Sequence, residues 1–221
     1  MAGFYRDWIV PKLVDVSMRD RRLVAFRSRV VSAAQGRVLE IGIGSGLNLP
    51  FYTGQARQIL GLDPSPRLLA RARRRVSATH APTQFLTGSA EQIPLDAGTV
   101  DTVVMTWVGC SIPNISLALD EIRRVLRSGG HLLFVEHGRA PHRGVALWQD
   151  RFDPLWARIS GGCHLNRSPD VLIRQAGLKM DRLETGYIPG PKITSFLYAG
   201  SATNRSATAR PRSLGPDQAN V

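Results

Sequence analysis

The stretch from Val38 to Tyr52, VLEIGIGSGLNLPFY, decides the fold of this chain. It begins as a short apolar run that contains Glu40 and then opens into three glycines at alternate positions, Gly42, Gly44 and Gly46. Because glycine has no side chain, such a turn can adopt positive backbone dihedral angles and lets a ligand approach the main chain closely. A strand that runs into a glycine turn is typical of the first strand of an open parallel sheet, whose loop lines the ligand crevice.

Short apolar strands and helical segments alternate along the chain after this turn. The expected strands are 37–42, 58–63, 83–88, 100–107 and 131–137, and helical spacing is found in 66–76, in 116–130 and near 170–175. Gly129 and Gly130 are expected to stop the second of these helices. Two further strand-like pieces, 178–186 and 193–200, flank a turn and predict an edge hairpin. The pattern predicts an α/β fold, a Rossmann-like seven-stranded sheet, mostly parallel with the last strand antiparallel, with helices on both faces.

Composition divides the chain into three parts. Residues 1–35 place apolar residues at three- and four-residue steps among basic ones, which predicts an amphipathic helical lid. Residues 36–200 carry the alternating pattern and suit one compact domain. Residues 201–221 are rich in Ser, Thr, Arg, Pro and Asn, contain few large apolar residues, and are expected to be disordered.

The formal net charge is +12, from 29 Lys and Arg against 17 Asp and Glu. A basic surface attracts anionic partners such as nucleic acid or acidic lipid head groups, although scattered arginines also fit a solvated face. No apolar run approaches the ~20 residues that cross a bilayer, and Arg6 and Asp7 stand where a signal peptide would be apolar. We therefore expect a cytoplasmic protein, with peripheral contact to an anionic membrane left open. The sequence does not specify an oligomeric state.

The chain has two cysteines, Cys110 and Cys163. Two are too few for a disulfide framework, and their separation lacks the paired spacing of a structural zinc site. We expect reduced, packed thiols and no bound metal.

The glycine turn departs from the common phosphate-binding patterns. The dinucleotide fingerprint requires G-x-G-x-x-G, and Leu47 stands where its third glycine would be. No Lys-Ser or Lys-Thr pair follows the turn, so the Walker pattern also fails. Asp63 ends the second expected strand, where a carboxylate can accept hydrogen bonds from both ribose hydroxyls, or can instead cap the next helix. A nucleoside without a required pyrophosphate fits best.

Five motifs in order resemble the class I S-adenosylmethionine-dependent methyltransferases. E-x-G-x-G-x-G stands at 40–46, the acidic strand end is Asp63, GSAEQIPL at 88–95 resembles the adenine loop, and VDTVVMTWVGCSI at 100–112 resembles the fourth strand with the loop at the methyl donor. EIRRVLRSGGHLLFVEH at 121–137 resembles the following helix, turn and fifth strand.

Within that superfamily the chain looks closest to the methyltransferase type 11 branch. It resembles the bacterial relatives of the mammalian membrane-associated thiol S-methyltransferases of the methyltransferase-like seven group. IGSGLNLPFY, VEHGRAPHRGVALWQDRFDPLWARISGGCHLNR and YRDWIVPKLVD carry this likeness. No long apolar N-terminal anchor like that of the mammalian members is expected, so membrane residence is not carried over.

The resemblance implies S-adenosyl-L-methionine as cofactor and S-adenosyl-L-homocysteine as product. The glycine turn would pass the amino acid part of the cofactor, Asp63 would hold the ribose, and the residues at 90–91 and 106–107 would face the adenine and the methionine. The implied cofactor residues are Glu40, Gly42, Gly44, Gly46, Asn48, Asp63, Pro64, Ala90, Glu91, Thr106 and Trp107.

Methyl transfer from a sulfonium needs mainly alignment and exclusion of water from the protein. His137, at the end of the fifth expected strand, is the predicted catalytic base, with a purely structural histidine as the alternative. Trp148, Phe152 and Trp156 recur at four-residue steps of one helix face, so they either wall an acceptor pocket or pack that helix on the sheet. His164 is a further candidate at the acceptor.

We expect a small, largely apolar acceptor, with a thiol favoured because a thiol ionises far more readily than a hydroxyl. The first alternative is a phosphatidylethanolamine N-methyltransferase at the membrane surface, which the basic amphipathic N-terminal segment supports. A nucleic-acid methyltransferase fits less well, because TWVG replaces the D/N-P-P-Y or F loop of base methylators and no nucleic-acid-binding motif is recognised. No nucleic-acid partner is expected.

Overall fold

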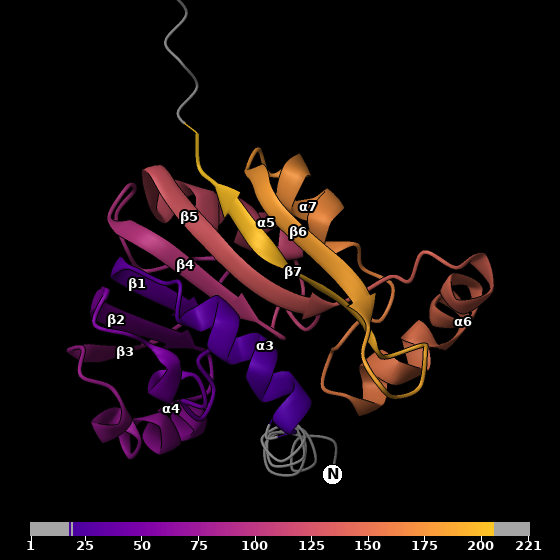
Figure 1. Ribbon diagram of the computed structural model, residues 1–221, viewed down its shortest axis with the longest axis horizontal. Helices are drawn as coiled ribbons and strands as arrows, with labels where there is room; N and C mark the ends of the chain where they lie inside the picture. The colour runs from indigo at the N-terminus through magenta and orange to yellow at the C-terminus, as the bar shows by residue number, and fades with distance from the viewer. Residues whose placement is uncertain (1–17, 19, 206–221) are drawn as a thin grey trace, which may run out of the picture.

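The computed structural model describes residue 18 and residues 20–205. One sheet runs through it with the strand order β3-β2-β1-β4-β5-β7-β6 (Figure 1). The strands are β1 Gly36–Ile41, β2 Ala56–Asp63, β3 Thr83–Thr87, β4 Val100–Thr106, β5 Leu126–His137, β6 Lys179–Tyr187 and β7 Phe196–Thr203. All are parallel except β7, which runs antiparallel to both β5 and β6. The predicted α/β sheet, including its edge hairpin, is confirmed.

Helices cover both faces of the sheet. They are α3 Arg21–Val31, α4 Pro66–Arg73, α5 Ile115–Val125, α6 Arg143–Ile159 and α7 Pro169–Gln175, with 3₁₀ turns η2 Leu49–Phe51 and η3 Val76–Ala78. One buried cluster joins α3 and α4 to the sheet, and a second joins α5 and α7 to it. In β1, Val38 belongs to the first cluster and Leu39 and Ile41 to the second. Because neighbouring side chains point to opposite faces, the central strands read as continuous apolar runs.

The end of α5 differs from the expectation that Gly129 and Gly130 stop the helix. The helix ends at Val125, and Leu126 is already extended, 2% exposed and paired with Val100 of β4. Burial of Leu126 in the sheet outweighs its good helix propensity. Gly129, at φ 75°, instead forms an irregularity within β5, where its N–H donates to Asn204 O at 2.7 Å.

The predicted domain boundaries are partly covered by the described residues. Strand β7 continues to Thr203, so the ordered domain extends past the predicted boundary at residue 200. Residues 206–221 of the predicted tail, and residues 1–17 and 19 of the predicted lid, lie outside the described part. Among the described residues, no helix combines the length and apolar character needed to cross a membrane.

The sheet topology places the site. From β1 the chain proceeds to β2 and β3 on one side and then returns to β4 and β5 on the other, so the strand order reverses between β1 and β4. The carboxyl ends of β1, β2 and β4 are Ile41, Asp63 and Thr106. In an open α/β sheet the ligand crevice forms beyond these ends.

Candidate active site

A cavity of about 900 Å³ lies beyond the carboxyl ends of β1, β2 and β4. Its volume is within the usual range for small-molecule and cofactor sites. The predicted cofactor residues that line it are Glu40, Gly42, Gly44, Asn48, Asp63, Pro64, Ala90, Glu91, Thr106 and Trp107. Gly46 is the predicted cofactor residue that does not line the cavity, and it has a different role.

The three glycines of the turn all have positive φ, at 63°, 57° and 79° for Gly42, Gly44 and Gly46. A Cβ on Gly42 would lie 2.4 Å from a methyl of Val108, whereas one on Gly44 would meet nothing closer than 3.8 Å. Gly44 therefore exposes its backbone to the cavity. A Cβ on Gly46 would lie 3.1 Å from Ala72 Cα. Gly46 thus lets α4 pack closely on the turn, which is a packing role.

Asp63 is buried at the cavity edge, with 5% of its surface exposed. Its Oδ2 accepts a hydrogen bond from Gly44 N at 3.0 Å and its Oδ1 accepts one from Ser65 N at 2.8 Å. Burial raises the pKa of this carboxyl. The N-cap of α4 is Ser65, so the alternative that Asp63 caps the helix is wrong. Each carboxylate oxygen retains acceptor capacity for a ligand hydroxyl.

Glu40 is the centre of a buried polar network below the glycine turn. Asn48 Nδ2 donates to Glu40 Oε1 at 2.8 Å and to Thr106 Oγ1 at 2.9 Å, and Tyr52 OH donates to Glu40 Oε2 at 2.7 Å. Burial raises the pKa of Glu40 to about 7. Asn48 Oδ1 is buried and accepts no hydrogen bond from the described residues. This atom provides an acceptor for a donor group of a ligand in the cavity.

The loop that was expected to border the adenine is fixed by Glu91. Glu91 Oε1 accepts from Asn114 N at 2.6 Å, and Ser89 Oγ donates to Glu91 Oε2 at 3.1 Å. Asn114 is also the N-cap of α5. Glu91 therefore joins the loop after β3 to the start of α5, which shapes this side of the cavity around Ala90.

Trp107 has the unusual backbone conformation of φ 50°, which is uncommon for a residue other than glycine. Its N–H donates to Val135 O at 2.9 Å, and the residue lines the cavity directly after β4. Such conformations cost about 1–3 kcal/mol and often occur at functional sites.

Among the residues of this site that were not predicted from the sequence, four stand out. Arg75 donates to Ser45 O at 2.6 Å and to Ser45 Oγ at 2.7 Å, and thereby holds the glycine turn from the end of α4. Met18 and Arg27 line the cavity from the N-terminal segment. Tyr52 completes the Glu40 network. The arginine cluster around Arg75 suggests only a basic face, so its sequence carries no signal for this contact.

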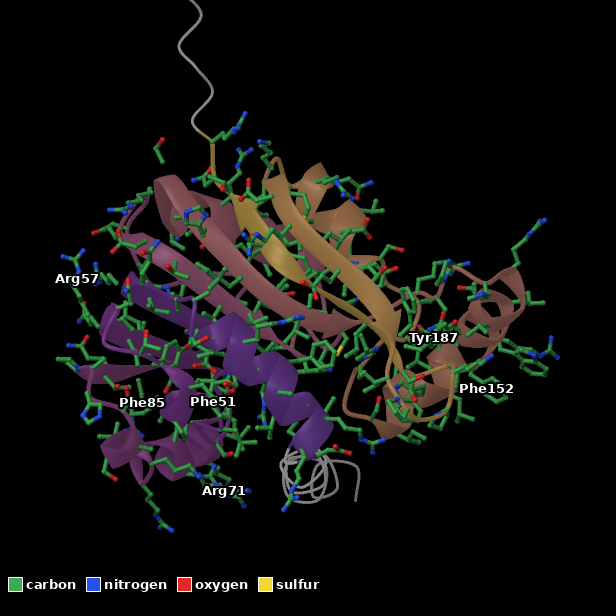
Figure 2. The ribbon with its side chains drawn as sticks, in the orientation of Figure 1. Phe51, Arg57, Arg71, Phe85, Phe152 and Tyr187 are labelled. Atoms are coloured by element: carbon green, nitrogen blue, oxygen red, sulfur yellow. The ribbon has the colours of Figure 1, made fainter. Side chains whose placement is uncertain are left out.

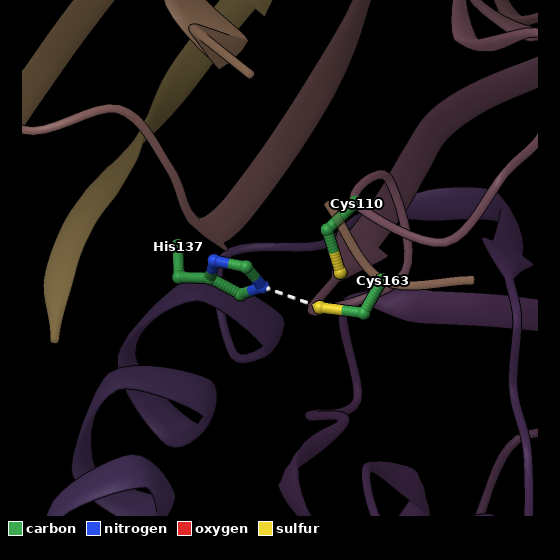
Figure 3. Close-up of side chains that lie close together, drawn as sticks. All are labelled: Cys110, His137 and Cys163. Atoms are coloured by element: carbon green, nitrogen blue, oxygen red, sulfur yellow. Dashed lines mark hydrogen bonds between the residues drawn. The ribbon is translucent and has the colours of Figure 1, made fainter. Parts of the chain in front are cut away.

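His137, the predicted catalytic base, does not line the cavity. Its Nε2 lies 3.0 Å from Cys163 Sγ, and Cys110 lies beside the pair (Figure 3). The hydrogen bond with Cys110 and burial both raise the pKa of the Cys163 thiol. The cavity lining reaches Ser111 and Gly161 but not these three side chains. The structure therefore gives no contact that supports His137 as a base at the cavity.

The aromatic residues of α6 also lie away from the cavity. Trp148 and Phe152 are 52% and 41% exposed and stack on each other with ring centroids 5.4 Å apart. Figure 2 shows Phe152 on the outer side of the molecule. Trp156 is half-buried and, like them, is absent from the lining. Trp148 and Phe152 therefore neither line the cavity nor pack α6 against the sheet, so both predicted roles are wrong for these two residues.

The body of the protein holds α6 through polar contacts. Gln149 is fully buried; its Nε2 donates to Gly138 O and Ile193 O, and its Oε1 accepts from Ala140 N. His164, the predicted acceptor residue, has its Nδ1 2.7 Å from Asp153 Oδ2. It thus helps to fasten α6 and does not line the cavity.

Comparison with known proteins shows which domain the chain resembles. Residues 39–134 match the family model described as a methyltransferase domain. The chain is 36% identical over 143 residues to the Homo sapiens thiol S-methyltransferase TMT1B, which covers 62% of this chain and 58% of the relative. It is 35% identical over 137 residues to the Cereibacter sphaeroides phosphatidylethanolamine N-methyltransferase. This alignment covers 60% of this chain and 66% of the relative. The chain thus spans less than two thirds of the length of either relative.

A solved structure shows the same fold. The N-methyltransferase NodS of Bradyrhizobium japonicum in complex with S-adenosyl-L-homocysteine superimposes with a TM-score of 0.65 at 16% identity, over 86% of this chain and 91% of that one. Together, the family match, the strand order and the glycine turn with Asp63 agree. Residues 39–134 thus match a methyltransferase domain, the sheet has the class I methyltransferase fold, and the turn with Asp63 suits S-adenosyl-L-methionine as methyl donor.

Proposed function

We propose that this protein transfers a methyl group from S-adenosyl-L-methionine to a small, largely apolar thiol. The observation that carries the proposal is that one cavity is lined both by Asp63 and Gly44 and by a group of apolar residues. The apolar lining includes Trp107, Val108, Ile112 and Pro113. The name of the human relative, a thiol S-methyltransferase, supports the choice of a thiol over other acceptors.

The chemistry of a thiol suits the residues of this site. A thiolate is a strong nucleophile, so the protein needs to align the acceptor sulfur with the methyl group and to exclude water. The described residues that line the cavity include no histidine or cysteine. The net charge of +12 would favour the thiolate form of a bound acceptor.

The test is an assay of the full-length protein with S-adenosyl-L-methionine and a series of alkyl and aryl thiols, with the matching alcohols as negative acceptors. We expect thioethers, detected by mass spectrometry, and no ethers. Asp63→Ala should lower turnover at low cofactor concentration, whereas Asp120→Asn, on the exposed face of α5, should leave it unchanged. Methylation of another acceptor class with no thioether formed would overturn the proposal.

A second candidate function, phosphatidylethanolamine N-methylation at a membrane surface, is favoured by the outer face of α6. This face, which we call the α6 apolar face, exposes Leu147, Trp148, Phe152, Leu155 and Ile159 at 41–68%. The same helix carries the exposed basic residues Arg143, Arg151 and Arg158. A basic amphipathic helix with aromatic residues is typical of a segment that lies in a membrane interface.

The position of α6 and one relative support this candidate. Ser160 and Gly161, directly after α6, line the cavity, so a bilayer on the α6 apolar face would contact the helix that leads into the cavity wall. The Cereibacter relative is named a phosphatidylethanolamine N-methyltransferase. The contact would be peripheral and electrostatically assisted.

Vesicles that contain phosphatidylethanolamine and an anionic lipid distinguish the two functions. The lipid candidate predicts methylated lipid, vesicle binding that salt weakens, and loss of both in the double variant Trp148→Ser, Phe152→Ser. The matched control is Val171→Ser, because Val171 is an exposed apolar residue of α7 outside this face. Thioether formation without any methylated lipid would exclude the lipid candidate.

A further inference from the structure

Three metal-ligating side chains that are far apart in the sequence meet next to the cavity. Cys110 follows β4, His137 ends β5, and Cys163 follows α6, and Figure 3 shows the two sulfurs and the imidazole directed toward one another. One ligand atom of each residue lies within 4.8 Å of the other two. Cys110 is buried, whereas His137 and Cys163 are half-buried. The cluster is therefore sheltered and still open to a small ion.

We propose that Cys110, His137 and Cys163 bind a zinc ion through two thiolates and one imidazole, with the fourth tetrahedral position left open. Thiolate and imidazole are the donors that zinc prefers over hard cations such as magnesium and calcium. Bond lengths of about 2.3 Å to sulfur and 2.0–2.1 Å to nitrogen place tetrahedral donors roughly 3.6–3.8 Å apart. The observed cluster needs only small side-chain adjustments to reach this spacing.

The loops that carry the three donors are fastened to one another. His164 N donates to Cys110 O at 2.9 Å, which joins the Cys110 loop to the Cys163 loop. Arg167 Nη1 donates to Gly109 O at 2.6 Å and to Ile112 O at 2.7 Å, one on each side of Cys110. A rigid set of supporting contacts is what holds metal ligands at a productive geometry.

Glu136 fixes the same loop from β5. Its Oε1 accepts from Val108 N at 3.0 Å and from Gly109 N at 2.9 Å, so the loop before Cys110 is held beside the strand that ends at His137. The donors of two different strands are thereby kept in register without the metal. Such preorganisation lowers the cost of ordering the ligands when the ion binds.

Charge and proton balance are simple for this site. Zinc binding releases one proton from each thiol to solvent and leaves the imidazole neutral, and no electron is transferred. The ion with two thiolates is then formally neutral. A neutral centre is compatible with the neighbouring Arg167 and with partial burial.

The open position has a use if the proposed thiol acceptor is correct, and this extension rests on that proposed function. Ser111 and Gly161 line the cavity and are close to Cys110 and Cys163 in sequence, so the cluster lies beside the cavity and an open position on that side would face a bound acceptor. A zinc ion in this position would lower the pKa of an acceptor thiol by coordinating its sulfur. The metal site itself is tested without any methyl acceptor.

The experiment uses the full-length protein, reduced, treated with a chelator, desalted and then given zinc alone. We expect one bound zinc per chain by elemental analysis. Affinity in Cys110→Ser, Cys163→Ser and His137→Asn should fall by roughly a hundredfold or more, since loss of a group that merely orients a ligand already costs about 10- to 100-fold. His142→Asn is the matched control, because His142 is exposed and lies outside the cluster. It should keep full zinc affinity.

Cobalt substitution provides a second measurement that needs no variant. The unaltered protein should show the visible bands of tetrahedral Co²⁺ and the near-ultraviolet thiolate-to-cobalt charge-transfer bands of two bound sulfurs. Failure of the reduced protein to bind zinc or cobalt would overturn the proposal, as would equal zinc affinity in folded His137→Asn and unaltered protein. A Cys110–Cys163 disulfide, found by peptide mapping in protein that binds no metal after reduction, would assign the pair to redox chemistry instead.

Discussion

Asp63 accepts a hydrogen bond from the backbone N–H of Gly44 at 3.0 Å, which joins the acidic end of β2 to the middle of the glycine turn. The other carboxylate oxygen accepts from Ser65 N at 2.8 Å. Backbone groups therefore hold the carboxylate at the cavity edge, and this geometry leaves lone pairs for two hydroxyls of a ribose.

Asp63→Ala should weaken the binding of S-adenosyl-L-methionine by roughly 1.5–3 kcal/mol, because it removes charge-assisted hydrogen bonds to the ribose. Isothermal titration calorimetry measures the change, and Asp120→Asn is the control carboxylate. Circular dichroism should show that the variant remains folded. Unchanged affinity would mean that Asp63 only fastens the turn to β2.

The unaltered protein should bind S-adenosyl-L-methionine or S-adenosyl-L-homocysteine and should not bind NAD. Leu47 occupies the position of the third glycine in the dinucleotide fingerprint. The turn therefore lacks the motif that binds a pyrophosphate at a helix N-terminus. The same calorimetric titration tests both ligands. Binding of NAD without binding of either methyl-donor ligand would contradict the assignment of the cavity.

Glu40→Gln should change how stability depends on pH. The folded protein raises the pKa of Glu40 from 4.5 to about 7, so between these values the folded state holds a proton that the unfolded state has released. The free energy of unfolding therefore decreases as pH rises from about 4.5 to 7, by up to roughly 3 kcal/mol from this group. The variant lacks this decrease and should gain stability relative to the unaltered protein between pH 5 and pH 8.

Urea unfolding of Glu40→Gln and of the unaltered protein, at pH 5 and at pH 8, measures the change in the free energy of unfolding. Glutamine keeps one oxygen acceptor for Asn48 and offers an amide donor to Tyr52, so the network can persist. If the free energy of unfolding changed with pH in the same way for Glu40→Gln and for the unaltered protein, the raised pKa of Glu40 would be contradicted.

Two alanine substitutions should separate the roles of the glycines. Gly46→Ala places a Cβ 3.1 Å from Ala72 Cα at φ 79°, so it should lower the free energy of unfolding by about 1–3 kcal/mol. Gly44→Ala meets no close neighbour and should mainly reduce cofactor affinity, with the smaller stability cost of its φ of 57°. Gly54→Ala is the control, since a Cβ there meets nothing within 4 Å. Equal effects of the first two variants on stability and affinity would contradict this division.

Deletion of residues 1–35 should unfold or strongly destabilise the protein, because it removes the buried side chains of Val30, Val31 and Ala34. Loss of three buried apolar side chains costs several kcal/mol in total. A shorter deletion, of residues 1–17, keeps α3 and tests the predicted lid by loss of activity with the fold retained. Thermal unfolding and turnover of both deletions are the measurements. Full activity after the shorter deletion would contradict the lid.

The sequence alone was sufficient where interactions are local. The apolar run from Val38, the three glycines after it and the carboxylate of Asp63 predicted the first strand, the turn and the place of the cavity, because backbone freedom and strand periodicity are properties of neighbouring residues. The strand and helix alternation likewise predicted the seven-stranded sheet. The end of α5 was missed because the pairing of Leu126 with Val100 depends on a strand distant in the sequence.

Tertiary structure decided which side chains meet and which face outward. The spacing of Trp148, Phe152 and Trp156 correctly predicts a helix. The face toward the body, however, carries Gln149 and Asp153, whose buried polar atoms are paired with backbone groups and with the side chain of His164. Cys110, His137 and Cys163 show no metal-binding spacing in the sequence and converge only because β4, β5 and the end of α6 meet at one edge of the sheet. Sequence patterns record local geometry, whereas contacts between distant segments depend on how the elements pack.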